Sequence, residues 1–153
     1  MRVRVLYAIE ALALTAWVGS VWTTGLLVAP TLFSMVKDRQ VAGGVAGQLF
    51  SATAFIGLIC GGLIMLIRYL RGRTSKRRDY ILWLVLAMVV ITAIGQFGIQ
   101  PVLAELRQQA FPLPVMQTEL GARFAAWHAV SGALYLVQCL AGLVLVVLRA
   151  SPQ

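Results

Sequence analysis

Charged side chains are scarce in this chain, and acidic ones are the scarcest. Only 12% of the 153 residues are charged, and Asp and Glu together number 5 against 13 Lys and Arg. A water-soluble domain of this length needs more polar surface than that, so the composition excludes one. With 60% hydrophobic residues and a mean hydropathy of +0.86, the composition indicates an integral membrane protein.

Histidine and cysteine are also rare. The chain has one histidine, His128, and two cysteines, Cys60 and Cys139. The motifs H-E-x-x-H, G-x-S-x-G, C-x-x-C, Walker A and C-x-x-C-H are all missing from the sequence. A single histidine excludes bis-histidine ligation of haem but still allows ligation by His and Met, or by His with an open position. Because no nucleophile and base stand together either, we expect a protein that is not an enzyme.

Long apolar runs are what the chain has in abundance. A helix needs about 20 apolar residues to cross the hydrocarbon core, and four runs reach that length. They cover about residues 5–33, 44–67, 80–104 and 124–148. The first run is too long for the apolar region of a signal peptide, so we expect a retained helix. The sequence therefore predicts an all-α membrane protein: one domain, residues 1–153, with four transmembrane helices in an antiparallel bundle.

Positive charge is concentrated on one side of the predicted bundle. The stretch RGRTSKRRD, residues 71–79, is strongly basic, and Arg2, Arg4, Arg68 and Arg149 fall on the same side of the four spans. The positive-inside rule then places both termini in the cytoplasm and the protein in a bacterial inner membrane. Anionic lipids at the cytoplasmic face are the expected partners of these residues. Nucleic acid is not expected as a partner, because no folded basic domain surrounds them.

Small residues in the second run recur at helical spacing. The series includes Gly43, Gly47, Gly57 and Gly61. Its two G-x-x-x-G pairs allow helix backbones to approach closely in lipid. A similar series of small residues runs from Ala13 to Thr24 in the first run. We expect these two faces to pack against each other, and a homodimer interface is the alternative use of the same motif.

Polar side chains converge in the half of the predicted bundle that lies away from the basic loop. Counting from the helix ends at about 1.5 Å per residue places them at related depths. They are His128, Gln96, Gln100, Glu105, Trp22, Thr24 and Gln48. Polar and ionisable residues within a span often mark a ligand site, although interhelical hydrogen bonds also account for them. We expect His128 to bind a ligand, with Gln96, Gln100 and Glu105 shaping its pocket.

Sulfur-containing side chains form a second, deeper tier. Cys60, Cys139 and Met88 lie at nearly the same depth on three different helices. Soft sulfur ligands of this kind suit monovalent copper, so these three residues and His128 are the candidate metal ligands. Ordinary packing is the alternative explanation for all three sulfur-containing residues.

Three further residues are unusual within the spans. Glu10 lies near the basic end of the first helix, where we expect it to pair with Arg4, Arg68 or Arg149. Pro30 and Pro101 lie near the other end of the first and third helices. Each removes a backbone hydrogen bond and predicts a local disturbance of its helix.

Four stretches of the sequence resemble a known family. They are WVGSVWTTGLLVAPTLF (residues 17–33), AGGVAGQLF (42–50), PVLAELR (101–107) and FAAWHAVSGALYLVQ (124–138). Together they resemble the bacterial membrane family catalogued as domain of unknown function 4149, whose eukaryotic relatives are of the transmembrane protein 205 type. The resemblance covers all four predicted helices and implies no agreed activity, so it transfers no catalytic residue.

The resemblance also suggests which ligands to consider. The family looks distantly similar to copper-resistance D-like and porphyrinogen-oxidase-like four-helix proteins, and its eukaryotic relatives are linked to platinum-drug resistance, so copper or haem is implied by analogy. The first hypothesis is therefore a membrane protein that binds or passes a small ligand, with a copper-like cation first. A haem-binding redox protein is the second hypothesis, and a structural or assembly subunit of a membrane complex is the third.

Overall fold

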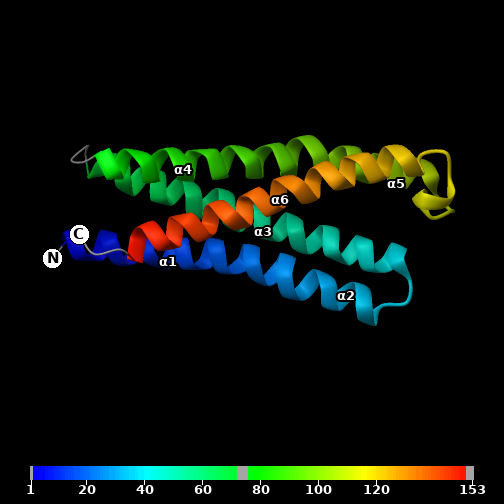
Figure 1. Ribbon diagram of the computed structural model, residues 1–153, viewed down its shortest axis with the longest axis horizontal. Helices are drawn as coiled ribbons and strands as arrows, with labels where there is room; N and C mark the ends of the chain where they lie inside the picture. Colours follow the sequence, from blue (N-terminus) through cyan, green and yellow to red (C-terminus); the bar gives the residue numbers. More distant parts are fainter. Residues whose placement is uncertain (1, 72–75, 151–153) are drawn as a thin grey trace.

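Four long helices run antiparallel in the computed structural model, which describes residues 2–71 and 76–150 (Figure 1). Each helix is long and apolar enough to cross a membrane. The candidate spans are Arg4–Met35, Arg39–Leu70, Tyr80–Ala110 and Gly121–Arg149. The predicted all-α membrane bundle is confirmed, and every helix is longer than predicted. Residues 72–75 of the predicted basic loop lie outside the described residues.

The first and third spans each change helix type part of the way along. The first consists of α1 (Arg2–Trp22), the π-helix η1 (Thr23–Val28) and α2 (Ala29–Met35), and the third of α4 (Lys76–Ala93), the π-helix η2 (Ile94–Ile99) and α5 (Gln100–Ala110). The second and fourth spans are the uninterrupted helices α3 (Arg39–Leu70) and α6 (Gly121–Ala150), and the 3-10 helix η3 (Val115–Gln117) precedes α6. The first and third spans therefore share one architecture.

Proline explains the position of both π-helices. Pro30 is the second residue of α2 and Pro101 the second residue of α5, so each proline lies two residues past the end of a π-helix. Proline cannot donate a backbone hydrogen bond, and its ring clashes with the preceding turn of an α-helix. In the first span the Ala29 N–H reaches back to the carbonyl of Thr24, one residue further than in an α-helix, and Gln100 does the same in the third. The wider turn takes up the disturbance that the sequence predicts.

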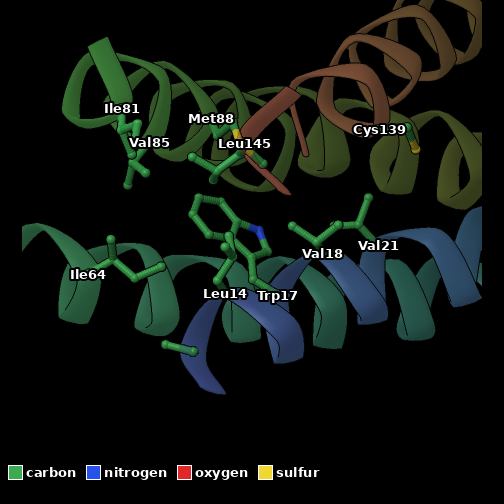
Figure 2. Packing of buried hydrophobic residues seen from close by; sticks show 11 residues of the cluster. Leu14, Trp17, Val18, Val21, Ile64, Ile81, Val85, Met88, Cys139 and Leu145 are labelled. Atoms are coloured by element: carbon green, nitrogen blue, oxygen red, sulfur yellow. The ribbon is translucent and has the colours of Figure 1, made fainter. Parts of the chain in front are cut away.

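The tightest packing lies in the half of the bundle that holds the termini, which we call the termini end. Trp17 is 0% exposed there and lies at the centre of the hydrophobic core, with Met88 and Leu145 nearby (Figure 2). The indole packs on α3 where Gly57 and Gly61 leave room, because a Cβ on either glycine would collide with it. The first and second spans thus approach closely through these two glycines.

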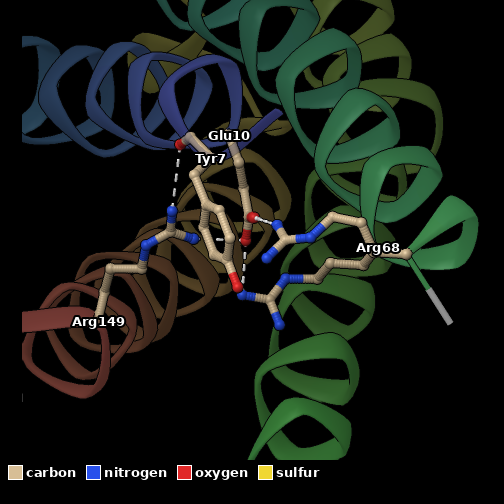
Figure 3. Close-up of polar contacts among 5 residues, drawn as sticks. Tyr7, Glu10, Arg68 and Arg149 are labelled. Atoms are coloured by element: carbon tan, nitrogen blue, oxygen red, sulfur yellow. Dashed lines mark hydrogen bonds and ion pairs between the residues drawn. The ribbon is translucent and has the colours of Figure 1, made fainter. Parts of the chain in front are cut away.

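A cluster of ion pairs joins three spans at the termini end. The Glu10 carboxylate, in a residue only 1% exposed, lies 2.6 Å from Arg68, 2.5 Å from Arg71 and 2.5 Å from Arg149 (Figure 3). The Arg71 guanidinium lies 3.5 Å above the ring of Tyr7, and Arg149 donates to the Tyr7 carbonyl. Pairing of Glu10 with Arg68 and Arg149 is confirmed, and Arg71 is a further partner. These contacts tie α1 to α3 and α6.

Candidate functional site

A cavity of about 320 Å³ lies in the half of the bundle away from the termini. All four spans and both π-helices contribute residues to its lining. Short π-helical segments within α-helices occur frequently at functional sites. The exposed lining residues Leu26, Phe33, His128 and Leu136 form its rim, so the cavity opens on the side of the bundle. In a membrane that opening faces lipid, and the volume falls within the range of roughly 300–1,000 Å³ that is usual for small-molecule sites.

The deep end of the cavity is polar. We call Trp17, Thr92, Gln96 and Gln138 the cavity floor. The Nε2 of Gln138, a residue only 4% exposed, donates to the Thr92 hydroxyl at 3.0 Å, and that hydroxyl donates to the Met88 carbonyl at 2.8 Å. Because a hydroxyl has only one hydrogen, Thr92 must accept from Gln138. This arrangement fixes the orientation of the Gln138 amide, with its Nε2 toward Thr92.

Three polar atoms of the cavity floor have no hydrogen-bond partner within the described part of the chain. They are Trp17 Nε1, Gln96 Oε1 and Gln138 Oε1. A buried polar group without a partner costs about 1–3 kcal/mol, and hydrocarbon offers no replacement for the missing bond. All three atoms are buried, and they belong to residues that line the cavity, so one N–H donor and two carbonyl acceptors of the floor are left unsatisfied.

The walls of the cavity are mainly apolar, and Tyr135 shows how its ring is held there. The Tyr135 hydroxyl donates to the Val21 carbonyl at 2.6 Å, so its polar atom is satisfied. Its ring packs edge-on against Phe50, with 4.9 Å between centroids, and occupies the space where Gly25 has no side chain. Tyr135 thus adds an aromatic wall between the floor and the rim.

A cation lines the cavity toward the end of α5. Arg107 is half-buried, and its guanidinium carbon lies 5.3 Å from the centroid of the Phe124 ring. His128 stacks on the same ring, with 5.9 Å between centroids and 7° between planes. Phe124 thus connects the cationic part of the lining with His128 on the rim.

The predicted ligand-binding residues fall into two groups. Gln96, Gln100 and His128 line the cavity together. Glu105, Trp22, Thr24 and Gln48 do not belong to its lining. Trp22 and Thr24 make interhelical hydrogen bonds instead: the Trp22 indole donates to the Cys139 carbonyl at 3.2 Å, and the Thr24 and Thr53 hydroxyls are 2.9 Å apart. Glu105 is exposed and accepts from Gln109.

The candidate metal ligands are divided between the cavity and the hydrophobic core. His128 and Cys139 line the cavity, and Cys139 also belongs to the core cluster together with Met88, against which Cys60 packs. Both cysteines are free. In residues 2–71 and 76–150, no three His, Cys, Asp or Glu side chains lie close enough to hold a metal ion. Among the described lining residues, His128 and Cys139 are the only histidine and cysteine, and Met88 does not belong to the lining, so the cavity offers neither a cluster of soft donors for copper nor the pair of His128 and Met88 for haem.

The predicted packing glycines also divide along α3. Gly57 and Gly61 accommodate the Trp17 indole. Gly47 lines the cavity, where a Cβ would lie 3.6 Å from the Arg107 guanidinium, and a Cβ on Gly43 would meet nothing within 4 Å. One helix face thus provides close packing at the termini end and cavity lining at the other.

Sequence reasoning missed several residues of this site, among them Gln138, Arg107 and Trp17. Gln138 carried a usable signal, because an amide within an apolar run is costly unless it has a use. Arg107 lies beyond residue 104, where the sequence predicts the third helix to end, whereas the helix continues to Ala110. The free indole N–H of Trp17 had no sequence signal, since its lack of a partner depends on how the ring lies against Gly57.

The fold and the cavity together define a class: a multi-pass, four-helix membrane bundle with a laterally open cavity and a polar cavity floor. Residues 12–112 match the family described as domain of unknown function (DUF4149), which covers more than half of the chain, so this protein belongs to that family. The matched region includes the first span from residue 12 onward, the second and third spans, and both π-helices. No curated protein and no solved structure matches the chain.

Proposed function

We propose that this protein binds a small amphiphilic molecule that enters the cavity from the surrounding bilayer. The single observation that carries the proposal is the set of three unpartnered polar atoms on the floor of an otherwise mainly apolar cavity. An apolar ligand body suits the walls, and a polar group at its deep end suits the floor. A neutral ligand group costs less to bring into hydrocarbon than a charged one.

The hydrogen-bonding pattern of the floor narrows the chemistry of that group. Trp17 Nε1 can only donate, and Gln138 Oε1 can only accept. A hydroxyl group both accepts and donates, so an alcohol can satisfy either kind of atom. These considerations favour an alcohol, or a group of similar capacity, over the copper-like cation expected from sequence. The cation would require a set of soft donors that the described lining residues do not provide.

The test is photolabelling of the purified protein in nanodiscs with dodecanol that carries a diazirine in mid-chain. Mass spectrometry then identifies the labelled residues. We expect labels to concentrate on cavity residues such as Val21, Phe50 and Leu134. Labels spread evenly over lipid-facing residues such as Leu12 and Leu140 would overturn the proposal.

A variant pair makes the test specific for the floor. Gln138→Leu removes the amide and keeps a side chain of similar size. We expect this substitution to raise the probe concentration for half-maximal cavity labelling about tenfold. Gln48→Leu makes the same chemical change at an exposed residue outside the lining and should leave that concentration unchanged. Because Gln138 also bonds Thr92, Gln96→Leu serves as a second floor variant. Equal labelling of the wild type and both floor variants would contradict the proposal.

A further inference from the structure

Arg107 is a positive charge on the lining of an apolar cavity, with no anionic partner among the side chains that the structure describes. The ion pairs of the described residues all involve Glu10, which lies at the termini end. Glu105, two residues before Arg107, is exposed and bonds Gln109 instead. An arginine stays charged at every relevant pH, and a partly buried charge without a counter-charge is costly.

The surroundings of Arg107 leave its guanidinium available on the cavity side. The Phe124 ring lies on one side of it, and Gly47, where a Cβ would lie 3.6 Å from Nη1, has no side chain near it. Neither neighbour is an acceptor for the five N–H groups of a guanidinium in the way that a carboxylate or phosphate is.

We infer that the ligand carries an anionic oxygen group, a carboxylate or a phosphate, which Arg107 binds while the neutral group reaches the cavity floor. This inference rests on the proposed function and specifies its ligand class. Gln96 and Arg107 lie eleven residues apart along the same span, which corresponds to about 16 Å at 1.5 Å per residue. The ligand is therefore an apolar chain with polar groups at both ends, one neutral and one anionic.

A matched pair of competitors tests this inference against the diazirine dodecanol. Dodecanol carries only the hydroxyl, and 12-hydroxydodecanoate adds a carboxylate at the other end. Each competitor is compared with itself across protein variants, so its partition between water and nanodisc cancels. We expect Arg107→Gln to raise the 12-hydroxydodecanoate concentration for half-maximal competition about tenfold and to leave that of dodecanol unchanged.

Two control variants separate charge from structure. Arg107→Lys keeps the charge, so the 12-hydroxydodecanoate concentration for half-maximal competition should stay close to that of the wild type. Arg123→Gln removes an exposed charge at the same end of the bundle and should change neither competitor. A third competitor, 12-hydroxydodecyl phosphate, tells whether phosphate is bound more tightly than carboxylate, and either order supports the inference provided that Arg107→Gln weakens both.

The failures of the two proposals are distinguishable. If dodecanol competes in a manner that depends on Gln138 but 12-hydroxydodecanoate is indifferent to Arg107→Gln, the anionic ligand is overturned and the proposed cavity function stands. If Arg107→Gln weakens both competitors equally, Arg107 only shapes the cavity and the inference is likewise overturned. If no probe labels the cavity, both proposals fail.

Discussion

Among the described residues, Glu10 makes the largest number of ion pairs. It meets Arg68, Arg71 and Arg149 while being 1% exposed. Glu10→Gln keeps the size of the side chain but leaves three clustered guanidiniums without this counter-charge. Because removing one partner of a buried ion pair costs about 3–5 kcal/mol, we expect a clearly lower midpoint of thermal unfolding in detergent, measured by circular dichroism.

The matched control for Glu10 is Glu105→Gln. Glu105 is exposed and accepts one hydrogen bond from Gln109, which a glutamine oxygen can also accept. Its substitution should change the free energy of unfolding by less than about 0.5 kcal/mol. Equal destabilisation by the two substitutions would mean that the Glu10 cluster adds no net stability beyond that of a surface carboxylate.

Sequence could identify which residue types belong to the candidate site, but not all of their partners. Gln96, Gln100 and His128 come together in one cavity, as their depths along the helices suggest. Thr24 lies at a comparable depth, but its hydroxyl is hydrogen-bonded to that of Thr53 and it does not line the cavity. Depth along a helix follows from counting residues, whereas the direction in which a side chain points depends on helix rotation, which the π-helix η1 alters.

At the scale of helices, the close approach of the first and second spans depends on Gly57. A Cβ there would collide with the Trp17 indole, whereas a Cβ on Gly62 of the same helix would meet nothing within 4 Å. We expect Gly57→Ala to destabilise the protein by about 1–3 kcal/mol, as overpacking does, and Gly62→Ala to be nearly neutral. Because Trp17 also belongs to the cavity floor, Gly57→Ala should shift its fluorescence as well.

Unfolding midpoints and tryptophan emission of the two glycine variants give the measurement. If Gly57→Ala and Gly62→Ala behave alike in both, Trp17 moves freely and the packing of α1 on α3 does not depend on this glycine. A loss of stability in Gly57→Ala without a change in emission would place the strain elsewhere than at the indole.

Helix boundaries illustrate what sequence leaves open at this scale. Pro30 and Pro101 locate both disturbances correctly, because each lacks a backbone donor. The third span nevertheless extends to Ala110, past the polar residues at which it was predicted to end. Polar residues can continue a helix beyond the hydrocarbon, so hydropathy marks the membrane-embedded part better than the helix end. Arg107 was therefore missed as a lining residue.

For the whole molecule, lipid makes the fold predictable and leaves the cavity unpredictable. Four apolar runs in hydrocarbon must become helices, since every backbone group needs a partner within its own segment. Their antiparallel order then follows from the short connections between them. The cavity depends on how far the helices separate beyond Trp17, which is set by particular contacts such as that of Tyr135 with Val21. Such contacts cannot be predicted from composition.

The orientation of the bundle in the membrane is the remaining prediction at this scale. Arg68, Arg71 and Arg149 all lie at the termini end, and the positive-inside rule places such an end in the cytoplasm. In a variant whose Cys60 and Cys139 are replaced by alanine, a cysteine is introduced either at the exposed Lys37, between α2 and α3, or at the exposed Arg4. A membrane-impermeant maleimide applied to intact cells should label Lys37→Cys only.

The two cysteine variants check each other. Arg4→Cys should react only after the cells are lysed, which shows that its thiol is reactive and was shielded by the membrane. The reverse pattern would place the termini outside and the Arg107 end of the cavity at the cytoplasmic leaflet. Because Arg107 lies close to the end of α5, the orientation of the bundle decides which leaflet supplies the anionic ligand. With the termini in the cytoplasm, that ligand must come from the outer leaflet.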